Sequence, residues 1–104
     1  MSTKTIVLQE RLDAINAVPL RAEMKDAIAN GARTLILDCA KTQFIDSSGL
    51  AALVSGHKAM RTEKGQFILA GVQGGAREIF DLTRMDLVFT MVPTLQEAIA
   101  ASKG

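Results

Sequence analysis

A carboxylate and two hydroxyls lie side by side in the middle of the chain, where Gln43–Leu50 reads QFIDSSGL. Asp46, Ser47 and Ser48 fall just before an apolar helical pattern, so we expect them at a helix N-terminus. Such an end leaves backbone N–H groups unpaired and carries a partial positive charge, which favours a phosphate attached to a serine. The segment is therefore a candidate phosphorylation site. The simpler interpretation is a helix cap, in which one hydroxyl bonds the backbone.

The single histidine cannot serve these hydroxyls as a base. His57 follows Ser48 on the same predicted helix, and the nine residues between them span roughly 13 Å. A Ser–His nucleophile is therefore excluded. We interpret His57 as a histidine at the edge of the core whose ring nitrogens have hydrogen-bond partners.

Other groups that could do chemistry are few. Cys39 is the only cysteine, so the chain cannot form an internal disulfide and lacks the ligands of a Cys/His zinc site. We expect Cys39 to pack as a small apolar residue. The turn at Gly71–Gly75 lacks the spacing of nucleotide-binding loops. We expect no metal and no cofactor.

The composition excludes several classes of protein. The chain has 104 residues, 48% of them hydrophobic, and a formal net charge of +1. This size predicts a single domain over residues 1–104, and the charge balance leaves no basic stripe for nucleic acid. No apolar run reaches the ~18 residues of a membrane span, and we expect no signal peptide. We expect no direct membrane contact, and the lone cysteine suits a cytoplasmic protein.

Short apolar runs alternate with helical patterns along the chain. We expect Asn16 to cap the first helix, Pro19 to lie in its first turn and Gly31 to end it. Ser47 or Ser48 should start the second helix. The expected strands cover residues 5–8, 35–37, 67–70 and 87–89, a third helix covers about 75–82, a last helix follows Thr94, and residues 39–46 form a loop.

Helical spacing predicts which side chains face an aliphatic core, because Phe is the only aromatic residue. Phe44 and Ile45 should also be buried beneath the sheet. The predicted inward positions are Ala17, Leu20, Met24, Ala27 and Ile28, then Leu50, Leu53, Val54, His57 and Met60, and then Ile79 and Leu82. The final helix is marked by Leu95, Ala98, Ile99 and Ser102.

Helices alternating with short apolar strands indicate an α/β fold with right-handed crossovers. We expect a small sandwich with a mostly parallel central sheet of about four strands, covered by about four helices.

Several segments resemble the signature of the STAS domain family, and within it the bacterial anti-sigma-factor antagonists. The resemblance spans roughly residues 5–100, and its most specific part is the Asp-Ser-Ser-Gly-Leu motif between a strand and a helix. The segments that carry it are Leu12-Asp13, Leu35–Asp38, Phe44–Leu50, Gly65, Phe67–Ala70 and Arg77–Leu82.

This resemblance implies a protein switch rather than an enzyme. In the family, the unmodified domain binds an anti-sigma factor that is also a serine kinase with a histidine-kinase-like ATPase fold, which frees the sigma factor. The kinase then phosphorylates a serine of the antagonist and the complex dissociates. A metal-dependent serine phosphatase resets the switch. The family's phosphoacceptor corresponds to Ser47 here, with Ser48 as the alternative.

The resemblance also implies a docking surface for the kinase on the helix that follows the serines. We further expect Gly49 to leave room for the partner's approach. A different function within the family is also open, because STAS domains serve as regulatory subunits of membrane transporters such as lipid-trafficking ABC systems. The residues implied in partner binding are Asp13, Asp46, Ser48, Gly49, Leu50 and His57.

The sequence departs from the family at its start. Family members have two strands before the first helix, whereas only about one strand's worth of residues precedes Asp13. We therefore expect a shortened N-terminal strand region. A shortened sheet would leave an edge that could pair with a second copy as a weak homodimer. Arg11 also replaces a small or acidic residue near the expected docking face.

Overall fold

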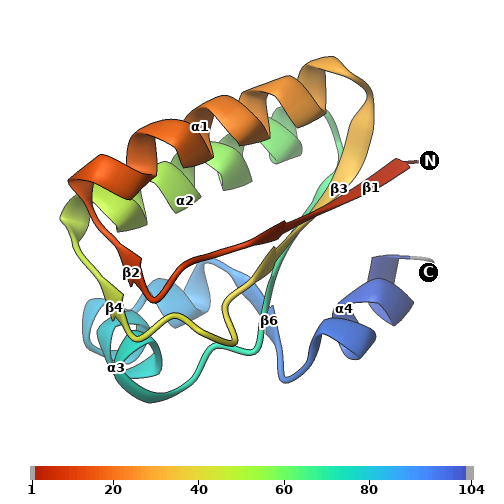
Figure 1. Cartoon of the computed structure of the whole chain (residues 1–104). Coiled ribbons are helices and arrows are strands. Elements are labelled where there is room, and N and C mark those ends of the chain that lie inside the picture. Colours follow the sequence, from red (N-terminus) through yellow and green to blue (C-terminus); the bar gives the residue numbers. More distant parts are fainter. Residues whose placement is uncertain (1, 103–104) are drawn as a thin grey trace.

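Strands and helices alternate along the chain in the computed structural model, which describes residues 2–102 (Figure 1). A short 3₁₀ turn, η1, spans Met85–Leu87. The strands are β1 (Ser2–Val7), β2 (Arg11–Leu12), β3 (Ala32–Asp38), β4 (Phe44–Ile45), β5 (Gln66–Ala70) and β6 (Thr90–Val92), and the helices are α1 (Ala14–Ala29), α2 (Ser47–Thr62), α3 (Gly74–Thr83) and α4 (Leu95–Ser102).

The central sheet has four strands in the order β1-β3-β5-β6, and every neighbouring pair is parallel. A second, two-stranded sheet joins β2 to β4, also in parallel. The α/β class, the parallel four-stranded sheet and the four helices are confirmed. Among residues 2–102, no helix has the length and apolar character needed to cross a membrane.

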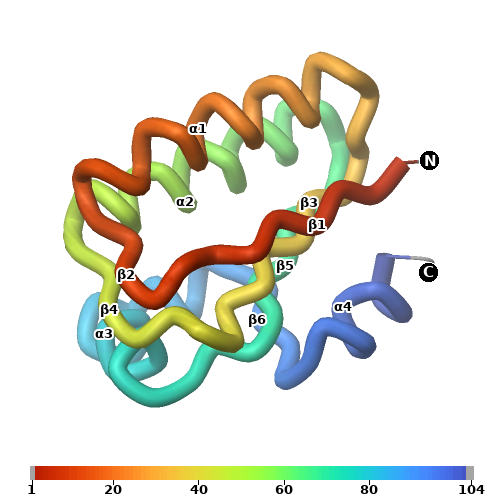
Figure 2. The backbone as a smooth tube through the Cα atoms, in the orientation of Figure 1, coloured from red at the N-terminus to blue at the C-terminus, as the bar shows by residue number. Residues whose placement is uncertain are grey.

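The helices form two layers about the central sheet. α1 and α2 lie side by side over one face, while α4 lies on the other (Figures 1 and 2). Leu35, Leu37 and Leu69 belong to the large core cluster beneath α1 and α2, and Ile36 and Ile68 to a smaller cluster with α4. This alternation along β3 and β5 follows from the two-residue period of a strand with both faces covered.

The first helix starts earlier than predicted. Asp13, not Asn16, is its N-cap, and its carboxylate accepts the backbone N–H groups of Ile15 and Asn16. Pro19 therefore lies inside α1 rather than in its first turn. Gly31 follows the helix with a φ of +96°, as expected for a left-handed residue at a helix end.

The strand predicted at residues 87–89 is wrong. Leu87 and Val88 are exposed, and the last strand of the sheet is β6, at Thr90–Val92. The chain leaves α3 through Arg84, which adopts a φ of 59°, and then forms η1. Only Phe89 of the predicted strand is buried, edge-on against Phe80.

Three further expectations also differ from the structure. Leu82 was expected to face the core but is 84% exposed, whereas Ile79 does pack against the core. Two strands precede α1 where one was expected, although β2 has only two residues. Its partner β4 lies in the stretch predicted to be a loop. This small pair is what positions the candidate site.

Candidate functional site

The β2–β4 pair brings two helix N-termini together. Leu12 is in register with Ile45, and the backbone N–H of Asp46 donates to the carbonyl of Leu12 at 3.1 Å. Asp13 and Asp46 each follow directly after one of these paired strands. The starts of α1 and α2 therefore lie side by side (Figure 1).

Aspartates, and not serines, cap both helices. One carboxylate oxygen of Asp13 lies 3.1 Å from the N–H of Ile15 and 3.0 Å from that of Asn16. The carboxylate of Asp46 accepts the N–H of Gly49 at 2.9 Å. Both aspartates have the extended backbone typical of an N-cap. The interpretation in which a serine hydroxyl caps the second helix is therefore wrong.

The two serines differ in exposure. Ser47 is the first residue of α2 and is exposed, whereas Ser48 is half-buried. Because Asp46 takes the capping role, the Ser47 hydroxyl is accessible from solvent and is not needed to hold the helix end. Among the two candidates, Ser47 is the more accessible to an external enzyme.

Gly49 is required by close packing inside the molecule. It is buried, and a Cβ added there would lie 2.5 Å from the carbonyl oxygen of Leu12 and 3.0 Å from a methyl carbon of Ile45. The missing side chain makes room for β2 and β4. This packing is an internal reason for the glycine, and access for a partner at Gly49 stays a prediction.

Leu50 and His57 lie on the inner side of α2. Leu50 is half-buried and packs against the core, within the first turns of the helix. His57 lies about 15 Å further along the axis than Ser47, with its ring edge-on to Phe67 and Phe89 at centroid distances of 5.9 and 5.6 Å. The structure thus groups Asp13, Asp46 and Leu50 with the serines, and separates His57 from them.

The environment of His57 differs from the one expected. Its Nδ1 atom is buried without a hydrogen-bond partner among the described residues, so the ring is not fully satisfied. Burial, and secondly the positive charge of Arg61, lower the pKa of His57 below its usual 6.5. The neutral ring is therefore favoured in the folded protein.

Neither Cys39, His57 nor Asp46 is placed to activate the Ser47 hydroxyl. Cys39 is buried as predicted, and its burial, together with the charge of Asp38, raises the thiol pKa to about 12. His57 is too distant, and the carboxylate of Asp46 is engaged in capping. The Ser47 hydroxyl therefore has no general base among these three residues.

One contact beside the serines was not predicted. Phe44 was expected to be buried but is 37% exposed, and the guanidinium of Arg11 lies 4.4 Å from its ring centroid. Arg11 also pairs with Asp13, with 3.9 Å between Nε and Oδ2. The alternation of Phe44 and Ile45 across a two-residue strand explains the error, because only one of the two can face the core.

Two exposed aliphatic residues on α1 flank the same region. Ile15 is 81% exposed and Val18 is 68% exposed. Both fall outside the helical stripe that starts at Ala17 and Leu20. The sequence did carry this signal, since apolar residues off the core-facing stripe of a helix indicate an unfilled contact surface.

Comparisons with known proteins agree with this geometry. The anti-sigma factor antagonist named BtrV, from Bordetella bronchiseptica, is 28% identical over 96 residues, which are 92% of this chain and 83% of that protein. The structure of an anti-sigma factor antagonist from Thermotoga maritima has the same fold, with a TM-score of 0.85 at 21% identity over 96% of this chain and 88% of that one.

The anti-sigma factor antagonist SpoIIAA is a further structural relative. Its unphosphorylated form gives a TM-score of 0.77 at 26% identity, over 96% of this chain and 88% of that one. Its phosphorylated form, from Bacillus, gives a TM-score of 0.72 at 26% identity, over 93% and 87%. The family model of the STAS domain matches residues 2–98, so the chain belongs to the STAS domain family.

Proposed function

We propose that this chain is a partner-switching regulator controlled by phosphorylation of Ser47. Its unphosphorylated form binds an anti-sigma factor that is also a serine kinase, which releases the sigma factor or an equivalent target. Phosphorylation ends this binding, and a metal-dependent serine phosphatase restores it. The chain is the substrate of both enzymes, in the cytoplasm. The relatives named as anti-sigma factor antagonists support this role.

The exposed hydroxyl of Ser47 carries the proposal. It stands at the first position of α2, and the cap of that helix is supplied by Asp46 through a 2.9 Å bond to Gly49. A kinase can therefore reach Ser47 without opening the helix. Ser48, which is half-buried, is the alternative acceptor.

The same geometry supports a switch that works by repulsion. A phosphate adds about −1.5 to −2 charges at neutral pH, so it changes a formal net charge of +1 to slightly negative. The N-terminus of α2 tolerates the anion within the chain. In a complex, a desolvated dianion beside the carboxylates of Asp46 and Asp13 costs several kcal/mol unless it is paired.

Phosphopeptide mapping of the protein isolated from its own cells tests the site. Cleavage after Lys41 and Lys58 releases one peptide that carries Ser47, Ser48 and the exposed Ser55, so fragmentation must locate the phosphate within it. We expect phosphate on Ser47, its loss in Ser47→Ala, and its retention in the matched variants Ser48→Ala and Ser55→Ala. Phosphate that persists in Ser47→Ala contradicts the assignment.

Binding to the kinase tests the switch itself. Ser47→Ala should bind the kinase constitutively and Ser47→Asp should bind it weakly, while Ser55→Asp, at an exposed position further along α2, should bind as the wild type does. Backbone amide shifts of the two forms should change only near Ser47. Co-purification with a transporter ATPase, without any serine kinase, would instead support a transporter subunit.

A further inference from the structure

We propose that the free edge of β1 is a self-association site, at which two copies of this chain pair their β1 strands in antiparallel fashion. β1 is an outer strand of the sheet and pairs only with β3 within the described residues. The opposite outer strand, β6, has three residues. β1 has six residues and contains no proline, so it offers the longer template for strand addition.

The direction of the backbone groups fixes which residues would pair. The N–H of Leu8 donates to the carbonyl of Asp38 on β3 at 2.9 Å. Because successive residues of a strand point their backbone groups to opposite sides, Thr3, Thr5 and Val7 direct theirs to the free edge. The irregularity of β1 lies between Ser2 and Thr3, so the stretch from Thr3 onward is regular.

One register uses all three of these residues. With Thr5 opposite Thr5 of the second copy, Thr3 lies opposite Val7, and every outward residue falls in a hydrogen-bonded pair. Such a pairing supplies about six backbone hydrogen bonds. It also places β-branched side chains opposite one another on the face away from α1, which is the favoured composition of cross-strand pairs. Val7, now exposed, would gain cover.

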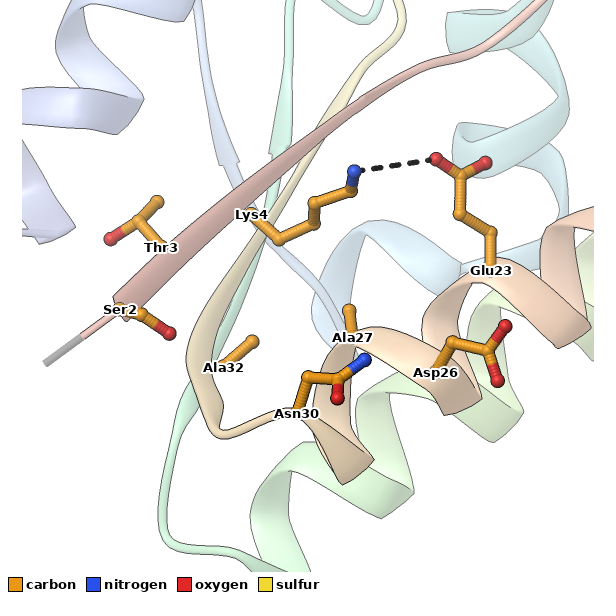
Figure 3. Close-up of a pocket in the computed structure, with 8 residues that line it drawn as sticks. All are labelled: Ser2, Thr3, Lys4, Glu23, Asp26, Ala27, Asn30 and Ala32. Atoms are coloured by element: carbon orange, nitrogen blue, oxygen red, sulfur yellow. Dashed lines mark ion pairs between the residues drawn. The ribbon is translucent and has the colours of Figure 1, made fainter.

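The face toward α1 is hollowed along the same edge. A cavity of about 420 Å³ lies between the first half of β1 and the end of α1, and a smaller one of about 90 Å³ lies between the second half of β1 and the start of α1. Glu23 lines both cavities, and its carboxylate lies 3.8 Å from Nζ of Lys4 (Figure 3). Figure 3 also shows Thr3 on the opposite side of the strand from Lys4.

The charges on this face suit a second copy. Lys4 pairs with Glu23, while Asp26, which lines the larger cavity, has no ion-pair partner among residues 2–102. In the register centred on Thr5, Lys4 of the second copy lies opposite Ile6, which shares the smaller cavity with Glu23. Each Glu23 then lies between two lysines, one from each chain, and the second lysine adds positive charge to a face that also carries Asp26.

The contact is small, so the dimer should be weak and reversible. Five residues from each chain bury less than the ~1,200 Å² that marks stable complexes. The Ser47 region lies at the start of α2, at the left of Figure 1 beside β2 and β4, whereas β1 runs from there toward the N-terminus at the right. Dimerisation should therefore leave both switch sites open, and it stands apart from the proposed function.

Sedimentation of the whole chain at increasing concentration tests this inference. We expect mostly monomer at about 10 µM and mostly dimer at about 1 mM. Thr5→Pro removes an outward N–H that β3 does not use, and should raise the dimer dissociation constant roughly tenfold or more. Thr5→Val keeps that N–H and the branched shape, so it should associate as the wild type does.

Exchanging the charges of Lys4 and Glu23 distinguishes the effect of their ion pairs on dimerisation from a general effect on folding. Lys4→Glu should weaken the dimer, and adding Glu23→Lys should restore it, because each lysine would again lie between two carboxylates. In hydrogen exchange, the amides of Thr3, Thr5 and Val7 should gain protection with concentration, while those facing β3 should not change. A chain that stays monomeric at about 1 mM, or a dimer that Thr5→Pro leaves intact, would overturn the proposal. It would also be overturned if the amides of Thr3, Thr5 and Val7 gain protection only when a strand from a different protein is added.

Discussion

The two ends of helix α2 are held by different kinds of contact. At its start, Asp46 caps the helix through the N–H of Gly49, and Gly49 lies against the backbone of β2. In its later turns, Gly56 lies against the side chains of Met24 and Phe67, and His57 packs edge-on against two phenyl rings. The first end is fixed by backbone geometry and the second by side-chain packing.

This difference explains why a switch can be placed at the first end. A helix terminus held by a cap and by backbone contacts does not depend on the side chain at its first position. Ser47 can therefore face solvent and change its charge without loosening the helix. At the inward positions of the later turns, such as Gly56 and His57, a charged group would have to enter a packed apolar region, where an unpaired charge is costly.

The largest expected effect compares the two buried glycines of α2. In Gly49→Ala the new Cβ would lie 2.5 Å from a backbone oxygen of Leu12, which cannot move without shifting β2. In Gly56→Ala the nearest atoms belong only to side chains: the sulfur of Met24 at 2.5 Å, which ends a flexible side chain, and a ring carbon of Phe67 at 2.8 Å. We expect Gly49→Ala to lower the free energy of unfolding by about 2–3 kcal/mol and Gly56→Ala to change it by about 1 kcal/mol or less.

Urea unfolding of the two variants measures this difference directly. Alanine is the better helix former at both positions by about 1 kcal/mol, so propensity alone would stabilise the two variants equally. Equal free energies of unfolding for Gly49→Ala and Gly56→Ala would contradict the distinction between backbone and side-chain contacts.

The next effect concerns the cap. Asp46→Ala removes the acceptor for the N–H of Gly49 and should cost about 1 kcal/mol. Asp46→Asn keeps an oxygen acceptor but loses the charge, so its stability should stay close to that of the wild type. Thermal unfolding of both variants separates capping from charge, and a cost for Asn as large as that for Ala would show that the carboxylate acts mainly through its charge.

The sequence predicted the strongly patterned elements and missed those without a pattern. β3, β5 and the core-facing side of α1 follow from continuous or periodic apolar residues. The β2–β4 pair has two residues per strand, which is too short for any period. The last strand was placed at 87–89 because Leu87-Val88-Phe89 is more apolar than Thr90-Met91-Val92, and the turn before it is made by Arg84 rather than by glycine.

The sequence placed the two serines at a helix N-terminus, where the structure has them, but it missed how that end is capped. Asp, Ser and Asn are all good caps, so the sequence could not decide between Asp46 and Ser48, or between Asp13 and Asn16. That choice depends on where the backbone leaves its extended conformation, which the β2–β4 pair determines. His57 was grouped with the serines because it shares their helix, whereas its actual neighbours are Phe67 and Phe89, far away in sequence.

A smaller effect on the free energy of unfolding is expected from the protonation of His57, in the later turns of α2. The folded protein lowers the pKa of His57 below the unfolded value of 6.5. Below that value the unfolded chain takes up a proton that the folded chain does not, so stability is full above pH 6.5 and falls as the pH drops toward the folded-state pKa. His57 is the only histidine. His57→Gln should therefore flatten the change in urea midpoint between about pH 7.5 and about pH 5.5, and an unchanged slope would contradict this.

The smallest effect on stability is expected at Ser47 itself. Its hydroxyl is exposed and the cap is made by Asp46, so Ser47→Ala should change the free energy of unfolding by no more than about 0.5 kcal/mol. Ser48→Ala, at a half-buried position, is the matched control. A loss near 1 kcal/mol for Ser47→Ala would mean that the hydroxyl helps to hold the helix end. Phosphorylation would then disturb the fold as well as the interface, and the contrast between the two ends of α2 would no longer explain the switch.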